Sequence, residues 1–172
     1  MATKNIPDKI NMFNVYNKGT KLIGVSDEVT LPDLEAMTET ISGAGILGEI
    51  DSPTVGHYGS MEMEIPFRVV NSDMFSVVKP NEVVDITLRA SEQTLSSNGL
   101  DFKGVRVVVR GLFKKYTGGS VKQGSPTNSS VTIELLYYML EIDGKKVMEL
   151  DKLNGVCVVN GEDVLKKARK LC

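Results

Sequence analysis

An apolar run between Ile133 and Ile142 constrains the fold of this chain more than any other feature. Six consecutive positions in it are apolar or aromatic: Leu135, Leu136, Tyr137, Tyr138, Met139 and Leu140. Successive side chains of a strand point to opposite faces, so this strand would lack a polar face and must be covered on both sides. A helix of the same chain or another subunit has to supply the cover, because an exposed apolar strand tends to aggregate.

Several other stretches alternate between apolar and polar residues. The period of two is clearest in residues 61–68, 84–91 and 104–115, where apolar side chains fall on one strand face and polar ones on the other. Residues 11–29 hold two apolar stretches separated by an Asn-Lys-Gly-Thr turn, as expected for a hairpin. Asp143-Gly144 marks another tight turn after the apolar run. These patterns predict a mainly β protein.

Two helices are expected beside the strands. Residues 71–79 form a short internal helix that is capped by Ser72 or Asp73 and ends before Pro80. A C-terminal helix begins at Asn160, which can act as its cap. Four apolar side chains share one face of that helix: Val164, Leu165, Ala168 and Leu171. The predicted fold class is therefore α+β, with strands dominant.

Residues 31–60 break the alternation. Leu31-Pro32 ends the preceding strand, residues 34–42 are polar with scattered apolar positions, and five Gly follow up to Gly59. Loops longer than about 12–15 residues are uncommon in compact domains unless they carry function or bind a neighbour. We expect residues 31–60 to be a long loop or arm of one domain that spans residues 1–172.

Part of this stretch matches a nucleotide-binding pattern. Gly43-Ala44-Gly45-Ile46-Leu47-Gly48 reads G-x-G-x-x-G, which binds phosphate when it follows a strand and opens a helix. The preceding residues are polar and not strand-like, and Pro53 and Gly56 follow too soon for the required helix. We therefore interpret the segment as a Gly-rich loop and predict no nucleotide site.

The inventory of reactive residues argues against catalysis. The chain has 172 residues with one His and two Cys, so a His and Cys metal cage or a disulfide framework cannot be built within it. His57 would have to serve any His-assisted nucleophile, and its Gly neighbours indicate a loop or strand end instead. We predict no enzyme activity, no cofactor and no metal site.

Charge separates the two parts of the chain. The 20 Lys and Arg against 22 Asp and Glu give a net charge of −2, so no basic nucleic-acid footprint dominates. Residues 1–66 carry a net charge of −6 and residues 67–172 one of +4. In a head-to-tail assembly an acidic surface on one copy would meet a basic surface on the next. No apolar run has the length of a signal peptide or a membrane span, so we expect a soluble cytosolic chain without stable membrane association.

Taken in order, these parts resemble the major tail tube proteins of contractile phage tails and R-type pyocins or other tailocins. The resemblance is nearly full-length and looser between Gly59 and Lys103. It is carried by four motifs: NMFNVYNKGTKLIGV, VTLPDLEAMTETISGAGILGEID, VVVRGLFKKYTGGSVKQG and YYMLEIDGKKVMELDKLNGVCVVNGEDVLKKARK.

The resemblance implies a β-sandwich or barrel flanked by a helix, assembled as hexameric rings that stack into a hollow tube inside a contractile sheath. It implies that the long loop reaches into adjacent subunits, which assigns inter-subunit roles to Leu31, Pro32, Leu34, Gly43, Gly45, Ile46, Leu47 and Gly48. Residues 135–140 become a subunit-interface strand that continues a sheet around the lumen. The implied partners are further copies, the sheath, baseplate or initiator proteins and a tape measure protein.

On this interpretation the tube is driven through a target envelope when the sheath contracts, so that a genome passes or the membrane leaks. A lumen that passes DNA must not hold phosphates, which makes the outward-facing Glu62 and Glu64 lumen candidates, unless they form an ordinary solvent-exposed face. The location would be a virion tail or tailocin assembled in the bacterial cytoplasm. The alternatives are a tube component of a type VI-like secretion system and, in another class, a β-barrel ligand-binding module.

Overall fold

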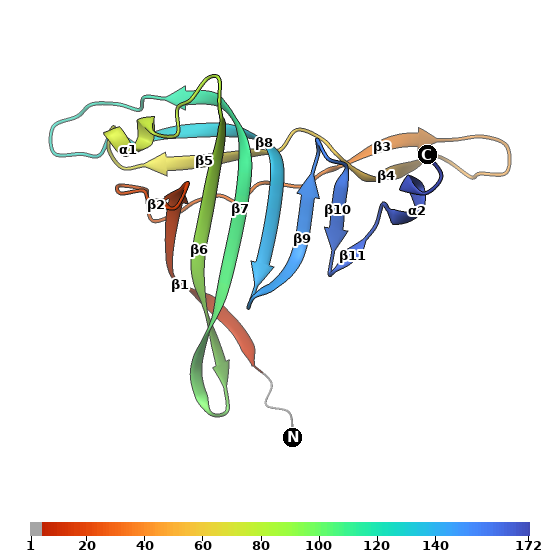
Figure 1. The fold of residues 1–172 in the computed structure, drawn as a ribbon, viewed down its shortest axis with the longest axis horizontal. Coiled ribbons are helices and arrows are strands. Elements are labelled where there is room, and N and C mark those ends of the chain that lie inside the picture. The colour runs from red at the N-terminus through yellow and green to blue at the C-terminus, as the bar shows by residue number, and fades with distance from the viewer. Residues whose placement is uncertain (1–4) are drawn as a thin grey trace.

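The computed structural model describes residues 5–172, and its main feature is one large antiparallel sheet of nine strands. Neighbouring strands hydrogen bond in the order β11-β10-β9-β8-β7-β6-β1-β2, and β5 pairs with β8 as a branch (Figure 1). The strands are β1 (Ile6–Asn17), β2 (Thr20–Lys21), β5 (Glu62–Phe67), β6 (Val83–Ser96), β7 (Gly99–Thr117), β8 (Ser129–Ile142), β9 (Lys145–Asp151), β10 (Val156–Val159) and β11 (Glu162–Asp163). The prediction of a mainly β fold is confirmed.

The register of β8 explains its apolar composition. Leu135 is buried on the inner face, and Tyr138 continues the same core three residues later. Between them Arg110 of β7 pairs with Tyr137 while its neighbour Gly111 pairs with Leu135, so Leu136 is the extra residue of a β-bulge. The bulge moves the inner face from odd to even positions. The apolar run is therefore two half-strands of opposite parity, and the chain's own core supplies most of the cover that the sequence required.

The bulge also explains one glycine. A side chain at Gly111 would collide with the carbonyl oxygen of Glu134 on the adjacent strand. A residue without Cβ therefore lets the two backbones approach at the point where the strand changes face.

A second layer covers the inner face of the sheet. Apolar side chains of β5 are almost fully buried: Met61 just before it, then Met63, Ile65 and Phe67. The segment 22–35 runs behind the long strands (Figure 1), and Val25 bridges to Phe67. Leu22 is buried, and Val29 and Leu34 pack against the same core. The arrangement is sandwich-like, with the core between the sheet and this second layer.

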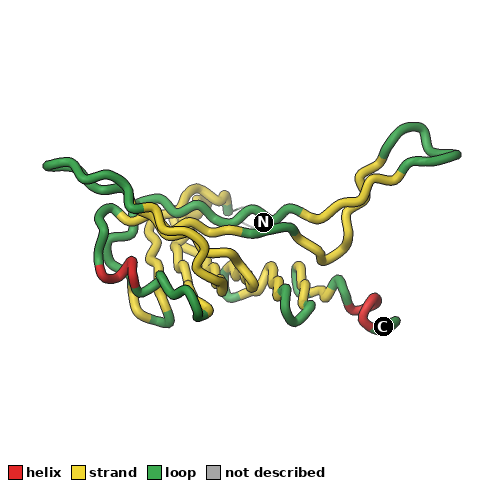
Figure 2. Tube along the Cα trace, turned by 90° about the horizontal axis from the view of Figure 1, so that it is seen from above, coloured by secondary structure: helices red, strands yellow, loops and turns green. Residues whose placement is uncertain are grey.

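Residues 36–58 form an arm that belongs to neither layer. Its strands β3 (Ala36–Ile41) and β4 (Ile50–Tyr58) pair only with each other, and the arm projects past the β11 side of the sheet (Figures 1 and 2). The interpretation of residues 34–42 as not strand-like is wrong, because Ile41 pairs with Ile50 and Thr40 with Asp51. The G-x-G-x-x-G segment leads from β3 into β4 instead of a helix, so the phosphate-binding geometry is not formed.

The two helices are shorter than predicted. Helix α1 (Ser72–Phe75) is capped by Asn71, whose Oδ1 accepts a hydrogen bond from the Met74 amide at 2.9 Å. Helix α2 (Lys166–Arg169) starts well after Asn160. Asn160 and Gly161 both have positive φ, 51° and 81°, and form the tight turn between β10 and β11. The prediction that Asn160 caps a long C-terminal helix is therefore wrong. Asn160 and Gly161 form a hairpin turn, and the C-terminal helix is a single turn.

Candidate assembly surfaces

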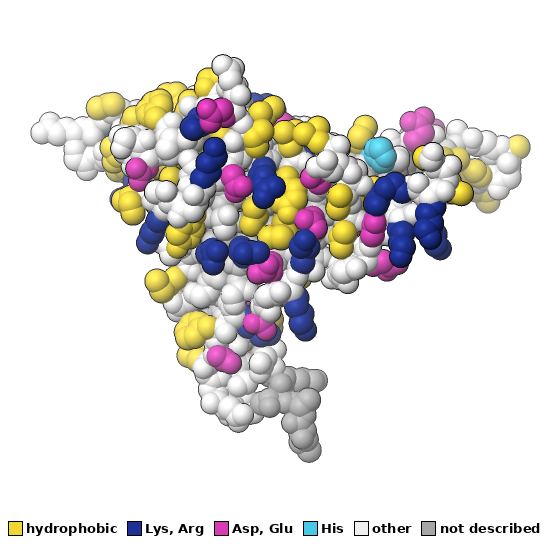
Figure 3. Space-filling view, in the orientation of Figure 1, with side chains coloured by type: hydrophobic (Ala, Val, Ile, Leu, Met, Phe, Trp, Pro, Cys, Tyr) yellow, Lys and Arg dark blue, Asp and Glu magenta, His cyan; other side chains and the backbone are white. Residues whose placement is uncertain are grey.

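The outer face of β6 to β9 carries a continuous chain of polar contacts, and we call it the front face. It faces the viewer in Figure 3, where basic and acidic side chains alternate across its centre. Arg110 Nε donates to Asp85 Oδ2 at 2.9 Å, and its guanidinium lies 4.8 Å from the centre of the Tyr137 ring. The Tyr137 hydroxyl donates to Glu149 at 2.8 Å. Interactions therefore link all four strands across the front face.

Two further ion pairs lie beside this series of polar contacts. Arg106 Nη2 donates to Glu141 Oε2 at 2.7 Å, and Lys146 Nζ donates to Glu149 Oε2 at 2.7 Å. Burial, together with the hydrogen bond to Glu149, raises the pKa of Tyr137 to about 12. The hydrogen bond from Lys146 lowers the pKa of Glu149. The tyrosine stays protonated and the carboxylate ionised around neutral pH, so the network keeps its donors and acceptors.

Glu62 and Glu64, predicted as lumen candidates, occupy different surroundings from the front-face network. Glu62 forms an ion pair with Lys114, which also lies 3.4 Å from Glu134. Glu64 lines a shallow depression with Asp27 and Glu28 of the second layer. Burial raises the pKa of Glu134, but hydrogen bonds from Ser60, Lys114 and Met61 outweigh it and lower that pKa.

The arm exposes apolar side chains on an element that has no core of its own. Leu47 at its tip is fully exposed, and Met37, Ile41, Ile50 and Val55 are each about half exposed. An isolated two-stranded hairpin is marginally stable in water. The residues predicted for the inter-subunit loop fall into two groups. Gly43, Gly45, Ile46, Leu47 and Gly48 form the tip, whereas Leu31, Pro32 and Leu34 belong to the second layer.

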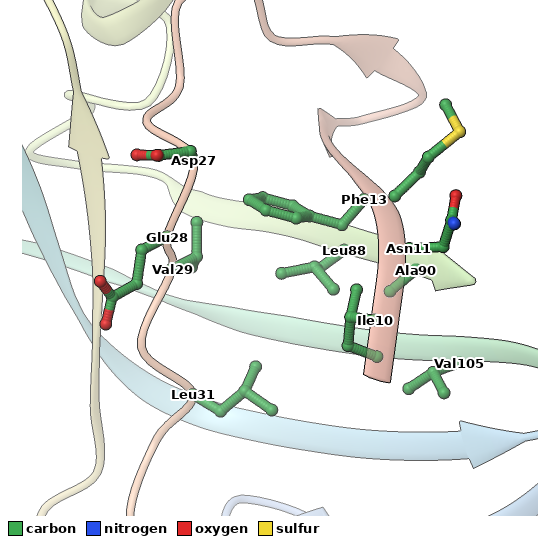
Figure 4. Close-up of a pocket in the computed structure, with 11 residues that line it drawn as sticks. Ile10, Asn11, Phe13, Asp27, Glu28, Val29, Leu31, Leu88, Ala90 and Val105 are labelled. Atoms are coloured by element: carbon green, nitrogen blue, oxygen red, sulfur yellow. The ribbon is translucent and has the colours of Figure 1, made fainter. Parts of the chain in front are cut away.

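An apolar groove with a volume of about 620 Å³ lies at the other end of the sheet. Phe13 and Ile10 of β1 and Leu88 of β6 form one wall, and Val29 and Leu31 of the second layer form the other (Figure 4). Asp27 and Glu28 stand on the rim with their carboxylates turned away from these apolar side chains (Figure 4). The groove can therefore accept an apolar segment without burying a charge.

The sheet ends in two edge strands with unpaired backbone. Most of β1 pairs with β6 alone, since β2 pairs only with Tyr16 and Asn17. At the other end β11 has two residues and pairs only with β10. By contrast β8 lies between β7 and β9, so residues 135–140 offer no open edge to a neighbouring copy. Within residues 135–140, the side chains that are only half-buried, and so keep surface for contact with a neighbouring copy, are Leu136, Tyr137 and Leu140.

Sequence reasoning did not assemble the front-face network or the groove. The alternation in residues 104–115 indicates that Arg106 and Arg110 share one strand face. The acidic members of the network, Asp85, Glu141 and Glu149, come from three other strands. Their contacts depend on register, and bulges in β7 and β8 change that register. The groove lies between β1 and residues 27–31, and no local sequence pattern predicts that these two segments are close together.

These surfaces define a structural β protein with open edges and an uncovered arm. Within residues 5–172 no group of His, Cys, Asp or Glu side chains is arranged to hold a metal ion. No helix in the described part of the chain is long and apolar enough to cross a membrane. The chain belongs to the phage tail tube protein FII family, whose model matches residues 7–171.

Individual relatives agree with this assignment. The chain is 30% identical over 167 residues to the tail tube protein of Escherichia phage P2, covering 96% of both chains. It is 27% identical over 159 residues to the major tail tube protein of Serratia phage KSP20, covering 92% of this chain and 91% of that one. Its fold is similar to that of a sheath/tube terminator structure of an extracellular contractile injection system, with a TM-score of 0.53 and 16% sequence identity. The match covers 78% of this chain and 96% of that chain. The chain is a structural tail tube subunit.

Proposed function

We propose that this chain forms the inner tube of a contractile tail, as hexameric rings stacked inside a sheath. The observation that carries the proposal is a single sheet with an open edge at each end and one broad face without projecting segments. Edge strands present unpaired N–H and C=O groups, and pairing β1 of one copy beside β11 of the next would extend the sheet around a ring. A closed ring has no remaining edges.

The arm gives each copy a second contact with its neighbour. It projects past the β11 edge, while the apolar groove lies at the β1 edge, and Figure 2 places the arm on the second-layer side of the sheet. Edge pairing between two copies would therefore bring the arm tip of one over the groove of the other. Leu47 entering between Phe13 and Leu31 would remove apolar surface from water on both sides.

The front face is the surface we assign to the lumen. The arm and the 118–128 loop both extend from the opposite side of the sheet in Figure 2, so the front face leaves a channel unobstructed. On this proposal Glu62 and Glu64 of β5 fall outside the lumen, and side chains of β6 to β9 line it instead. The projecting segments face neighbouring copies and the sheath.

The role is mechanical, without catalysis. Sheath contraction would drive the tube through a target envelope, after which a genome passes or the membrane leaks. A tape measure protein would occupy the lumen before that, and baseplate or initiator proteins would start assembly in the host cytoplasm. The finished location is the virion tail or a headless tailocin.

Negative-stain electron microscopy of the purified chain at rising concentration, with light-scattering mass alongside, tests this proposal. We expect six-fold rings or hollow tubes, either spontaneously or after addition of baseplate and sheath components. A chain that stays monomeric under both conditions would overturn the tube proposal. The groove would then favour a ligand-binding module, which a bound apolar ligand in native mass spectrometry would reveal.

A further inference from the structure

Three arginines gather on the front face where phosphates would pass, and this inference rests on the proposed lumen assignment. Arg89 of β6 lies directly opposite Arg106 of β7, and Arg110 follows on the same face of β7. Like charges directly opposite each other on a sheet are unfavourable. Guanidinium groups are also the side chains best suited to bind phosphate. A bare triplet of this kind would hold a duplex that moves along it.

Two of the three guanidinium groups form ion pairs with carboxylates from neighbouring strands. Asp85, opposite Arg110 in register, accepts from Arg110 Nε at 2.9 Å. Glu141, opposite Arg106 on the other side, accepts from Arg106 Nη2 at 2.7 Å. All four side chains remain partly exposed, from 23% for Glu141 to 51% for Arg110. The pairs therefore sit at the surface, where phosphates would otherwise reach the arginines.

Fold stability does not account for these pairs. Ion pairs with this degree of exposure contribute little to stability because solvent screens them. Arg106 also keeps its Nε buried without a hydrogen-bond partner, so its position in the sheet is not optimised for the fold. The two ion pairs affect the surface charge more than they affect stability, since each pair removes one cation from the patch that a polyanion would meet.

We propose that Asp85 and Glu141 mask Arg110 and Arg106, so that duplex DNA moves along the front face without being held. This differs from a lumen that repels DNA with unpaired glutamates. The face is kept close to neutral by cross-strand pairing, and Arg89 is left as its single arginine outside the two pairs. Removal of the two carboxylates would convert the face into a DNA-binding surface.

The test uses the unassembled full chain and a short fluorescent DNA duplex, with binding followed by fluorescence anisotropy over a salt series. The double variant D85N/E141Q unmasks both arginines. The matched control D33N/E39Q makes the same change in net charge in the second layer and the arm, where both residues are exposed. Circular dichroism and thermal melting confirm that both variants keep the wild-type fold.

We expect D85N/E141Q to bind the duplex at least tenfold more tightly than wild type at low salt. Its log K should fall more steeply with log salt, by about two phosphate contacts. Adding R106Q and R110Q to this variant should remove the gain. Equal gains in the D33N/E39Q control would attribute binding to net charge and overturn the proposal, as would the absence of any gain in D85N/E141Q.

Failure of the lumen assignment would be recognised separately. The variant Thr87→Cys, on the front face, in a Cys172→Ser background should react in assembled tubes with a small maleimide but not with a bulky polyethylene glycol maleimide. Equal reaction with both reagents would place the front face on the outside of the tube, whatever the DNA experiment shows.

Discussion

The arm and the sheet both carry apolar side chains on paired strands, but they differ in what covers those side chains. In the sheet, Ile86 of β6 and Ile133 of β8 are completely buried by elements of the same chain. In the arm, Leu47 is fully exposed and β3 pairs only with β4. The sheet can therefore fold from intramolecular contacts, whereas on the proposed assembly the arm tip gains its apolar cover from another copy. On this proposal, one part of the chain serves folding and another serves assembly.

The largest expected effect is in the core between the sheet and the second layer. Phe67→Ala should lower the free energy of unfolding by about 3–5 kcal/mol, because it removes a fully buried ring and leaves a cavity between the two layers. Urea unfolding of the monomer measures this loss. The arm substitution Leu47→Ala is the matched control, with an expected change within about 0.5 kcal/mol. Similar losses for both variants would show that the arm is part of the core and break the comparison.

Assembly should show the opposite ranking. Leu47→Asp would place a charge in an apolar groove, and we expect the concentration needed for tube formation to rise by about tenfold or more. Sedimentation of tubes at graded concentrations measures this threshold. Leu153→Asp, at an exposed position in the turn between β9 and β10, is the control. If both variants raise the threshold equally, general surface charge and not the arm limits assembly.

A smaller effect is expected where the second layer is tied to α1. Asn71 donates to the Ile23 carbonyl oxygen at 2.9 Å and caps the helix at the Met74 amide. Asn71→Ala should cost about 1–2 kcal/mol of unfolding free energy. Asn98→Ala, in the β6–β7 turn, should change it by less than about 0.5 kcal/mol. A neutral Asn71→Ala variant would mean that apolar contacts alone hold the segment 22–35 on the sheet.

The smallest expected effect is the response of the sheet to acid. The hydrogen bond from Lys146 lowers the pKa of Glu149 below its usual 4.5, so the stabilisation is complete above that value. It is lost as the pH falls through the folded-state pKa, because the unfolded state then binds the proton more readily. Urea unfolding from about pH 6 down to about pH 3 measures the loss. Glu149→Gln should make the profile shallower, and an unchanged profile would remove Glu149 as a contributor.

Sequence reasoning located most of the sheet because alternation is a local property. Residues 61–68 and 84–91 carry the period of two, and Asp143-Gly144 supplies a turn with positive φ at both positions, 51° and 74°. The family resemblance followed from the order of such pieces. Both depend on neighbouring residues along the chain, so no knowledge of distant contacts was needed.

Local patterns failed where a distant partner decides the conformation. Residues 36–41 have no strong strand pattern and become a strand because β4 pairs with them. Asn160 suits a helix cap and a turn equally well, and pairing of β11 with β10 selects the turn. Propensity alone is a weak guide when tertiary pairing competes with it.

The apolar run of β8 divides what the sequence determines from what only the tertiary structure decides. The composition of residues 135–140 requires cover for that run, and this follows from side-chain alternation along any strand. Whether the chain itself or a neighbour provides the cover depends on the bulge at Leu136, which turns Leu135 and Tyr138 to the same face. The partners of Arg106 and Arg110 likewise follow from the register of β7 with β6 and β8. Register joins residues far apart in the sequence, so it is settled only when the whole sheet has formed.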